Sequence, residues 1–363
     1  MADQGLTGGR YHTLDAWRGL AALAVLAYHS INTIVTPGRG PITDLLLHGW
    51  LGVFVFFPIS GYCILAATCS GRNPTPGQFL KRRWLRIFPT YWASIVVAVV
   101  VLVIASPFGV AFDQLRAPGW HWLSIATLTQ TIAGMPNAIN PVYWSLCYEE
   151  QFYLLVAGTL LLPARLRPAA LLALSGVTSA WRLAAGPAAI SGWFVDFWLE
   201  FAVGMAVFGW SHPAFGRAWA SAVILLSGAV VAWQGQLAPL ASTAVAIALL
   251  CLRQWDVATS RLRPVKALAA VGAMSYSLYL IHVPVAGRVV NGLNRLVERP
   301  SDYWLLMVLA ASAITIPAAY VFYRAVEVRF VSRGQSRLNP ASDLTTGDGR
   351  RWVAPKDDPV RLW

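Results

Sequence analysis

The sequence carries little charge for its length. Only 12% of its 363 residues are Asp, Glu, Lys or Arg, whereas a soluble domain carries about a quarter. Hydrophobic residues make up 57% of the chain, and 17 residues are Trp. This balance excludes a water-soluble enzyme and leaves no room for a large soluble domain. It is typical of a membrane protein with several spans and with aromatic rings at both interfaces.

Cysteine patterns, repeats and cleavage signals are also missing. The four cysteines show no C-x-x-C or other metal-ligand spacing, so neither a zinc site nor a disulfide framework is predicted. We expect no bound metal and no resident cofactor. The chain shows no internal repeat. Its first apolar run lacks a clear cleavage pattern, and we expect it to be retained as a span.

Ten apolar windows of about 20 residues, the length that crosses roughly 30 Å of hydrocarbon, are present in the chain. They predict an all-α polytopic membrane protein, a bundle of about ten transmembrane helices within residues 1–333. The polar segment 334–363 has too few apolar residues for a core and is predicted to be a disordered cytosolic tail. The expected windows are 14–35, 45–68, 87–110, 142–163, 168–186, 193–210, 218–234, 238–253, 267–290 and 303–323.

The positions of the basic residues predict the orientation. With the N-terminus inside, 21 of the 28 Lys and Arg residues fall on the inner side and five on the outer side. Cytoplasmic loops hold such an excess, so both termini are predicted to be cytoplasmic. The net charge of +12 is then explained by inner loops, and we expect no nucleic-acid partner.

Ionisable residues inside the spans are candidate site residues, because each charge in hydrocarbon costs at least a few kcal/mol. Arg18 and His29 are 11 residues apart in the first window. They share one helix face at a distance of about 16 Å. The alternative is an arginine that reaches the interface and a histidine that bonds to a neighbouring helix. The pair Glu149 and Glu150 opens the fourth window, and adjacent residues point about 100° apart, so at least one is expected to face the interior.

Three further groups of polar residues are candidates of different kinds. Arg83 and Arg86, one helical turn apart, are suited to binding a phosphate group. Their alternative role is a topology signal that contacts lipid headgroups. A stripe in the ninth window is expected to bind substrate or to hold helices together; it consists of Ser275, Tyr279 and His282. A buried ion pair or triad is expected between the fifth and sixth windows, formed by Arg182, Asp196 and Glu200.

Five segments in this order resemble the membrane acyltransferase-3 family, whose members O-acylate bacterial glycans and some antibiotics. The resemblance extends from about Thr13 to Phe330. The segments are Leu14-Asp15-Ala16-Trp17-Arg18-Gly19 with His29, Gly52-Val53 with Phe56-Phe57-Pro58-Ile59-Ser60-Gly61-Tyr62, Arg82-Arg83-Trp84-Leu85-Arg86-Ile87-Phe88-Pro89, Trp144-Ser145-Leu146 with Glu149-Glu150-Gln151-Phe152-Tyr153, and Ser275-Tyr276-Ser277-Leu278-Tyr279-Leu280-Ile281-His282.

The resemblance implies that His29 is essential and that Arg18, Arg83 and Arg86 bind an acyl donor, acyl-CoA. Two local departures concern the second window: Pro58 replaces a small aliphatic residue, and no acidic residue follows Gly52-Val53. We also expect no SGNH hydrolase-like domain of the kind that some members carry. We therefore expect the chain to transfer the acyl group directly or to hand it to a separate protein.

The mechanistic hypothesis makes His29 the general base that removes a proton from an acceptor hydroxyl. Glu149 or Glu150 would orient that imidazole, as the third member of a triad does. The expected reaction is O-acetylation of a carbohydrate in the bacterial cytoplasmic membrane. Two alternatives stay open: acylation of a hydrophobic secondary metabolite such as a macrolide, and secondary transport. Membrane lipid is a further expected partner.

Overall fold

The computed structural model describes residues 11–34, 37, 40–69, 74–105, 118–135, 139–186 and 190–330. Its regular structure within these ranges consists of helices and contains no strand. The predicted all-α class is therefore confirmed for the described part of the chain. The predicted tail 334–363 lies outside the described residues.

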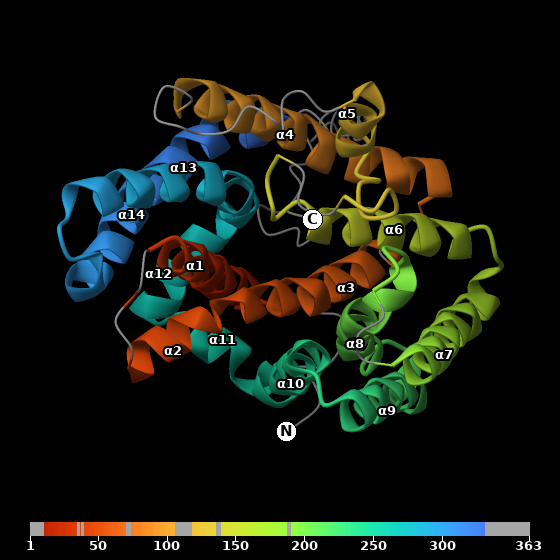
Figure 1. The fold of residues 1–363 in the computed structure, drawn as a ribbon. Coiled ribbons are helices and arrows are strands. Elements are labelled where there is room, and N and C mark those ends of the chain that lie inside the picture. The colour runs from red at the N-terminus through yellow and green to blue at the C-terminus, as the bar shows by residue number, and fades with distance from the viewer. Residues whose placement is uncertain are drawn as a thin grey trace, which may run out of the picture.

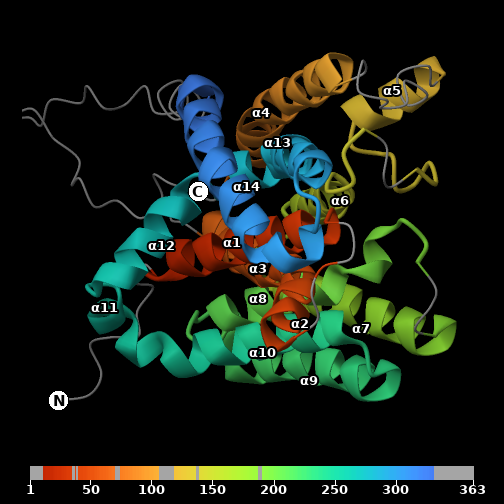
Figure 2. The same ribbon diagram turned by 60° about the vertical axis from the view of Figure 1, so that its left-hand side comes forward.

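Helices α1 (Leu14–Asn32) and α3 (Val53–Cys69) occupy the middle of the bundle (Figure 1). Figure 2 shows a group of helices on each side of this central pair, and α6 (Trp144–Thr159) lies between the two groups. One group contains α4 (Pro76–Ala105), α13 (Ser275–Leu296) and α14 (Pro300–Phe322). The other contains α7 (Arg167–Ala185), α8 (Trp198–Gly209), α9 (Gly216–Gln234) and α10 (Leu237–Leu252).

Shorter helices connect these elements. Between α1 and α3 the chain forms α2 (Pro41–Leu47) and the 3-10 turn η1 (Gly49–Gly52), which packs against α1. The other short helices are α5 (Gly119–Ala126), η4 (Ala164–Leu166), η5 (Phe194–Asp196), η6 (Arg253–Trp255), α11 (Asp256–Thr259), α12 (Arg263–Ala273) and η7 (Tyr323–Glu327).

The predicted count of ten spanning helices is not confirmed. Within the described residues, five helices are long and apolar enough to cross a membrane, or six if α12 and α13 form one broken span. These two helices are bent by 72°, so the expected window 267–290 is not one straight helix. Helix α8 has 12 residues and is about 18 Å long, too short to cross alone. An apolar window cannot reveal such features, because helices enclosed by protein are as apolar as helices that face lipid.

Glycines allow the central helices to approach their neighbours closely. A Cβ atom added to Gly61 of α3 would lie 1.9 Å from the carbonyl oxygen of Phe201, and one added to Gly204 of α8 would lie 1.8 Å from that of Pro58. The crossing of α1 and α12 is equally close, at Gly19 and Gly272. Small residues at such crossings favour association of helices in membranes, because backbones can pack directly.

We expect Gly61→Ala and Gly204→Ala to destabilise the protein by about 1–3 kcal/mol, because the new methyl group pushes backbone against backbone. The matched controls are Gly158→Ala and Gly176→Ala, on α6 and α7, where an added Cβ meets nothing within 4 Å. Thermal unfolding in detergent micelles measures the difference. Equal midpoints for the two pairs of variants would contradict this account of the crossing.

Candidate active site

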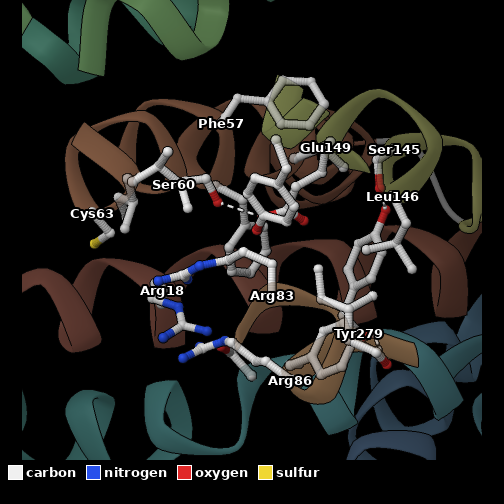
Figure 3. Close-up of a pocket in the computed structure, with 18 residues that line it drawn as sticks. Arg18, Phe57, Ser60, Cys63, Arg83, Arg86, Ser145, Leu146, Glu149 and Tyr279 are labelled. Carbon is white, nitrogen blue, oxygen red and sulfur yellow. Dashed lines mark hydrogen bonds between the residues drawn. The ribbon is translucent and has the colours of Figure 1, made fainter. Parts of the chain in front are cut away.

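A cavity opens on one side of the central helices, among α1, α3, α4, α6 and α13. The guanidinium groups of Arg18, Arg83 and Arg86 converge at one end of it (Figure 3). At the other end, the hydroxyl oxygens of Ser145 and Tyr279 lie 2.7 Å apart. The cavity therefore connects a cationic end with a hydroxyl-lined end inside an apolar bundle. We call it the arginine cavity.

The three arginines come from two helices, α1 and α4, that both line the cavity. Arg83 and Arg86 are one turn apart on α4, and Arg18 of α1 forms an ion pair with Asp15 at 3.5 Å. Arg83 is only 5% exposed, and its guanidinium carbon lies 5.8 Å from the ring centre of Phe79. Its Nε atom has no hydrogen-bond partner among the described residues. A buried cation with an unused donor favours an anionic ligand at this end.

The two glutamates separate, as their 100° spacing on a helix requires. Glu149 lines the arginine cavity and accepts hydrogen bonds from Ser60, at 2.8 Å, and from Tyr153 (Figure 3). Glu150 does not line it, and its buried Oε2 has no partner within the described ranges. Neither carboxylate hydrogen-bonds to His29 in the described part of the chain. These contacts give no support to the predicted role of orienting His29.

Two histidines lie next to the hydroxyl-lined end. Nδ1 of the fully buried His282 is 2.8 Å from the carbonyl oxygen of Tyr279. A carbonyl only accepts, so Nδ1 carries the hydrogen and Nε2 presents a lone pair. The His282 ring centre is 5.7 Å from that of Tyr279 and 5.1 Å from that of His29. The two imidazoles therefore continue the line of polar groups beyond the cavity, which His29 itself does not line.

The three residues of the polar stripe predicted in the ninth window lie in two different places. Ser275 and Tyr279 line the arginine cavity, whereas His282 lies behind Tyr279. Ser275 is fully buried, and its hydroxyl has no partner among the residues described. Tyr279 also hydrogen-bonds to the carbonyl oxygen of Val142, at 3.0 Å. Two of the three residues thus have side chains that a ligand in the cavity would touch.

The expected ion-pair group lies elsewhere, between α7 and α8. Arg182 Nη1 is 2.7 Å from Glu200 Oε1, and both side chains are buried. Asp196 contributes to Arg182 only its backbone carbonyl, at 3.0 Å. Its carboxylate accepts from the Tyr148 hydroxyl at 2.9 Å and from the Gly192 backbone amide at 2.9 Å. The sequence allowed either an ion pair or a triad here. The structure contains a pair of side chains, Arg182 and Glu200.

Sequence reasoning did not select Ser60, Tyr153 or Glu327. Ser60 and Tyr153 lie within the segments that carry the family resemblance, but they carry no charge and so gave no signal of their own. Glu327 is 6% exposed and accepts a hydrogen bond from Ser277 at 2.6 Å. It follows the last expected window and lies on the π-helical turn η7, a geometry frequent at functional sites. The signal in the sequence that could have identified Glu327 is an acidic residue just past the last apolar window.

The fold defines a helical integral membrane protein, and its arginine cavity has a cationic end inside the bundle. The comparison with protein families identifies the protein further: the model of an acyltransferase domain, that of the acyltransferase-3 family, matches residues 11–324. The chain belongs to this family, and the sequence resemblance is confirmed. Of the motif residues, Arg18, Arg83, Arg86, Glu149 and Ser275 all line the same cavity.

Individual relatives match over shorter stretches. The chain is 30% identical over 160 residues to peptidoglycan O-acetyltransferase OatA of Listeria monocytogenes, covering 41% of this chain and 24% of the relative. It is 31% identical over 156 residues to O-acetyltransferase OatA of Staphylococcus aureus, covering 39% and 23%. It is 32% identical over 122 residues to exopolysaccharide production protein ExoZ of Rhizobium meliloti, covering 33% and 37%. No solved structure matches the chain.

We expect Glu200→Gln to destabilise the protein by about 3–5 kcal/mol, because it leaves the buried Arg182 without its counter-charge. The matched control is Glu298→Gln, at an exposed glutamate, for which we expect a change within about 0.5 kcal/mol. Thermal unfolding of the purified proteins in detergent provides the comparison. A Glu200 variant as stable as the Glu298 variant would show that the pair does not hold α7 and α8 together.

Proposed function

We propose that this protein is an O-acyltransferase of the bacterial cytoplasmic membrane, which transfers an acetyl group from acetyl-CoA to a hydroxyl group of a carbohydrate. The observation that carries the proposal is the arginine cavity, with cations at one end and hydroxyls beside two imidazoles at the other. Family membership supports acyl transfer. The printed names of two relatives, peptidoglycan O-acetyltransferase and exopolysaccharide production protein, support a carbohydrate acceptor.

The arginine end suits the phosphates of the donor. Arg18, Arg83 and Arg86 belong to the end of the bundle predicted to be cytoplasmic, where acyl-CoA is available. Guanidinium groups bind phosphate oxygens with two parallel hydrogen bonds. With the nucleotide held there, the thioester would extend along the apolar wall of the cavity toward Ser145 and Tyr279.

The histidine end suits the transfer itself. His29 would take the proton of the acceptor hydroxyl while that oxygen forms a bond to the thioester carbonyl carbon. The carbon–sulfur bond then breaks, and CoA leaves as a thiol after receiving the proton. His282 Nε2 is buried and has no hydrogen-bond partner among the residues that the structure describes. It would accept a hydrogen bond from His29 and hold that ring in place, the role first assigned to a glutamate.

We expect His29→Ala to lower transfer at least 100-fold, because general base catalysis contributes about 10²–10⁴. Membranes containing the protein are supplied with radiolabelled acetyl-CoA and cell-envelope carbohydrate, and the label released by mild base measures the ester. The matched control is His48→Ala, at an exposed histidine whose ring contacts only the carbonyl oxygen of Asp44 among the described residues. Equal label in wild type and His29→Ala would remove His29 from the chemistry.

We expect Arg83→Gln to raise the KM for acetyl-CoA at least tenfold, because a charge-assisted hydrogen bond to phosphate is lost. The KM for S-acetylpantetheine, which carries no nucleotide phosphates, should stay within about twofold, since the lost contact is absent from that donor. Lys81→Gln is the control, because Lys81 is exposed on the same helix and does not line the cavity. A parallel rise for both donors would contradict phosphate binding by Arg83.

A further inference from the structure

A second cavity lies on the opposite side of α3, with a volume of about 370 Å³. Small-molecule sites are typically about 300–1,000 Å³ in size. Its walls come from the last turns of α7 and α9, the first turn of α10, the segment from η1 into α3, and residues in and around η5. It is therefore at the end of the bundle where α1 ends after His29, and α7, α9 and α10 lie together there in Figure 2. We call it the outer cavity.

One layer of aromatic rings separates the two cavities. Phe57 lines the arginine cavity, whereas Phe54 and Phe197 line the outer cavity. The ring centre of Phe57 is 5.6 Å from that of Phe54 and 5.8 Å from that of Phe197. A ligand in the outer cavity thus lies one ring away from the space proposed for the acyl donor.

The polar groups in the wall of the outer cavity are held in position. The Asp196 carboxylate, which lines the cavity, accepts hydrogen bonds from Tyr148, Ser191 and Gly192. The charge of Arg182 is balanced by Glu200 at 2.7 Å, and its Nη2 donates to the amide oxygens of Gln234 and Gln236 at 2.9 and 3.2 Å. The amide nitrogen of Gln234 returns a bond to the Arg182 carbonyl oxygen at 2.8 Å. With its cation already paired, this wall does not suit a phosphate, unlike the arginine cavity.

Much of the remaining wall is aromatic, and the rest is aliphatic. Trp50, Phe54, Trp181 and Phe197 line the cavity. Flat rings pack against the C–H faces of a pyranose, and amide oxygens, which have two lone pairs each, accept hydrogen bonds from sugar hydroxyls. A neutral ring with several hydroxyl groups, such as a sugar, can make both kinds of contact. A lipid chain would use the rings but would make no use of the second lone pair of each amide oxygen.

We propose that the outer cavity binds one sugar unit of the acceptor carbohydrate and so holds the acceptor at the His29 end of the bundle. This inference rests on the proposed function, for which it supplies the acceptor site. Binding at this cavity involves no residue of the arginine cavity, so the affinities for donor and acceptor should change independently.

The test fills the outer cavity with a larger side chain. Ala185 lines the cavity, and its neighbour Ala184 is exposed on the same helix and does not. We expect Ala185→Trp to raise the KM for the carbohydrate fraction at least tenfold while the KM for acetyl-CoA stays within twofold. Ala184→Trp, the matched control, should leave both values unchanged. Equal behaviour of the two variants, or an equal rise for donor and acceptor, would overturn the proposal.

Equilibrium binding separates a failure of this site from a failure of the proposed function. Purified wild-type protein in detergent is titrated with fluorescently labelled oligosaccharide released from the same envelope fraction, without any acyl donor. Binding that is weakened at least tenfold by Ala185→Trp but not by Ala184→Trp supports the sugar site even if no acetyl transfer is found. No binding by the wild type, or equal binding by all three proteins, would overturn the sugar site. A cavity occupied by lipid would give one of these two results.

A second pair of variants tests the aromatic wall without filling the cavity. Trp181 lines the outer cavity, whereas Trp233, 68% exposed near the end of α9, does not. We expect Trp181→Ala to weaken oligosaccharide binding at least fivefold and Trp233→Ala to leave it unchanged. Thermal midpoints of both variants show whether they remain folded. A loss of the same size in both would contradict a role for Trp181 in sugar binding.

Discussion

The burial of positive charge inside an apolar bundle is the constraint on which the site depends. Arg18, Arg83 and Arg86 come together where little water is available, so each needs acceptors or counter-charges from the protein or from a ligand. Asp15 supplies one such charge at 3.5 Å from Arg18. The unused donor on Arg83 marks a place where the described residues do not complete the set. The same constraint pairs Arg182 with Glu200 on the far side of α3.

Close helix crossings make this arrangement possible. The glycines on α3 and α8 let their backbones touch, and those on α1 and α12 do the same. Helices α1 and α3 are thereby held between two groups of helices, and a cavity opens on each side of α3. The rings of Phe54, Phe57 and Phe197 lie between the cavities. The donor and acceptor sites proposed here follow from that division.

Much of the arginine cavity could be predicted from the sequence, because charges in apolar windows are visible there. Arg18, Arg83 and Arg86 were expected to act together, and they line one cavity. The sequence did not decide between Glu149 and Glu150, since adjacent residues on a helix differ only in direction. The hydrogen bonds of Glu149 to Ser60 and Tyr153 decide this, and they depend on how α3 and α6 pack. Asp196 likewise turned its carboxylate to Tyr148 instead of Arg182.

By itself the sequence determined the class of the protein, because low charge and long apolar windows leave helices in a membrane as the available solution. It also determined the family, through five short motifs. Only the tertiary structure decided the 72° bend between α12 and α13, the place of Glu327 beside Ser277, and the outer cavity. Each of these depends on contacts between helices that are distant in the chain. The apolar content of a segment can be read from the segment alone. Which face of a helix turns toward the interior depends on the helices that pack against it.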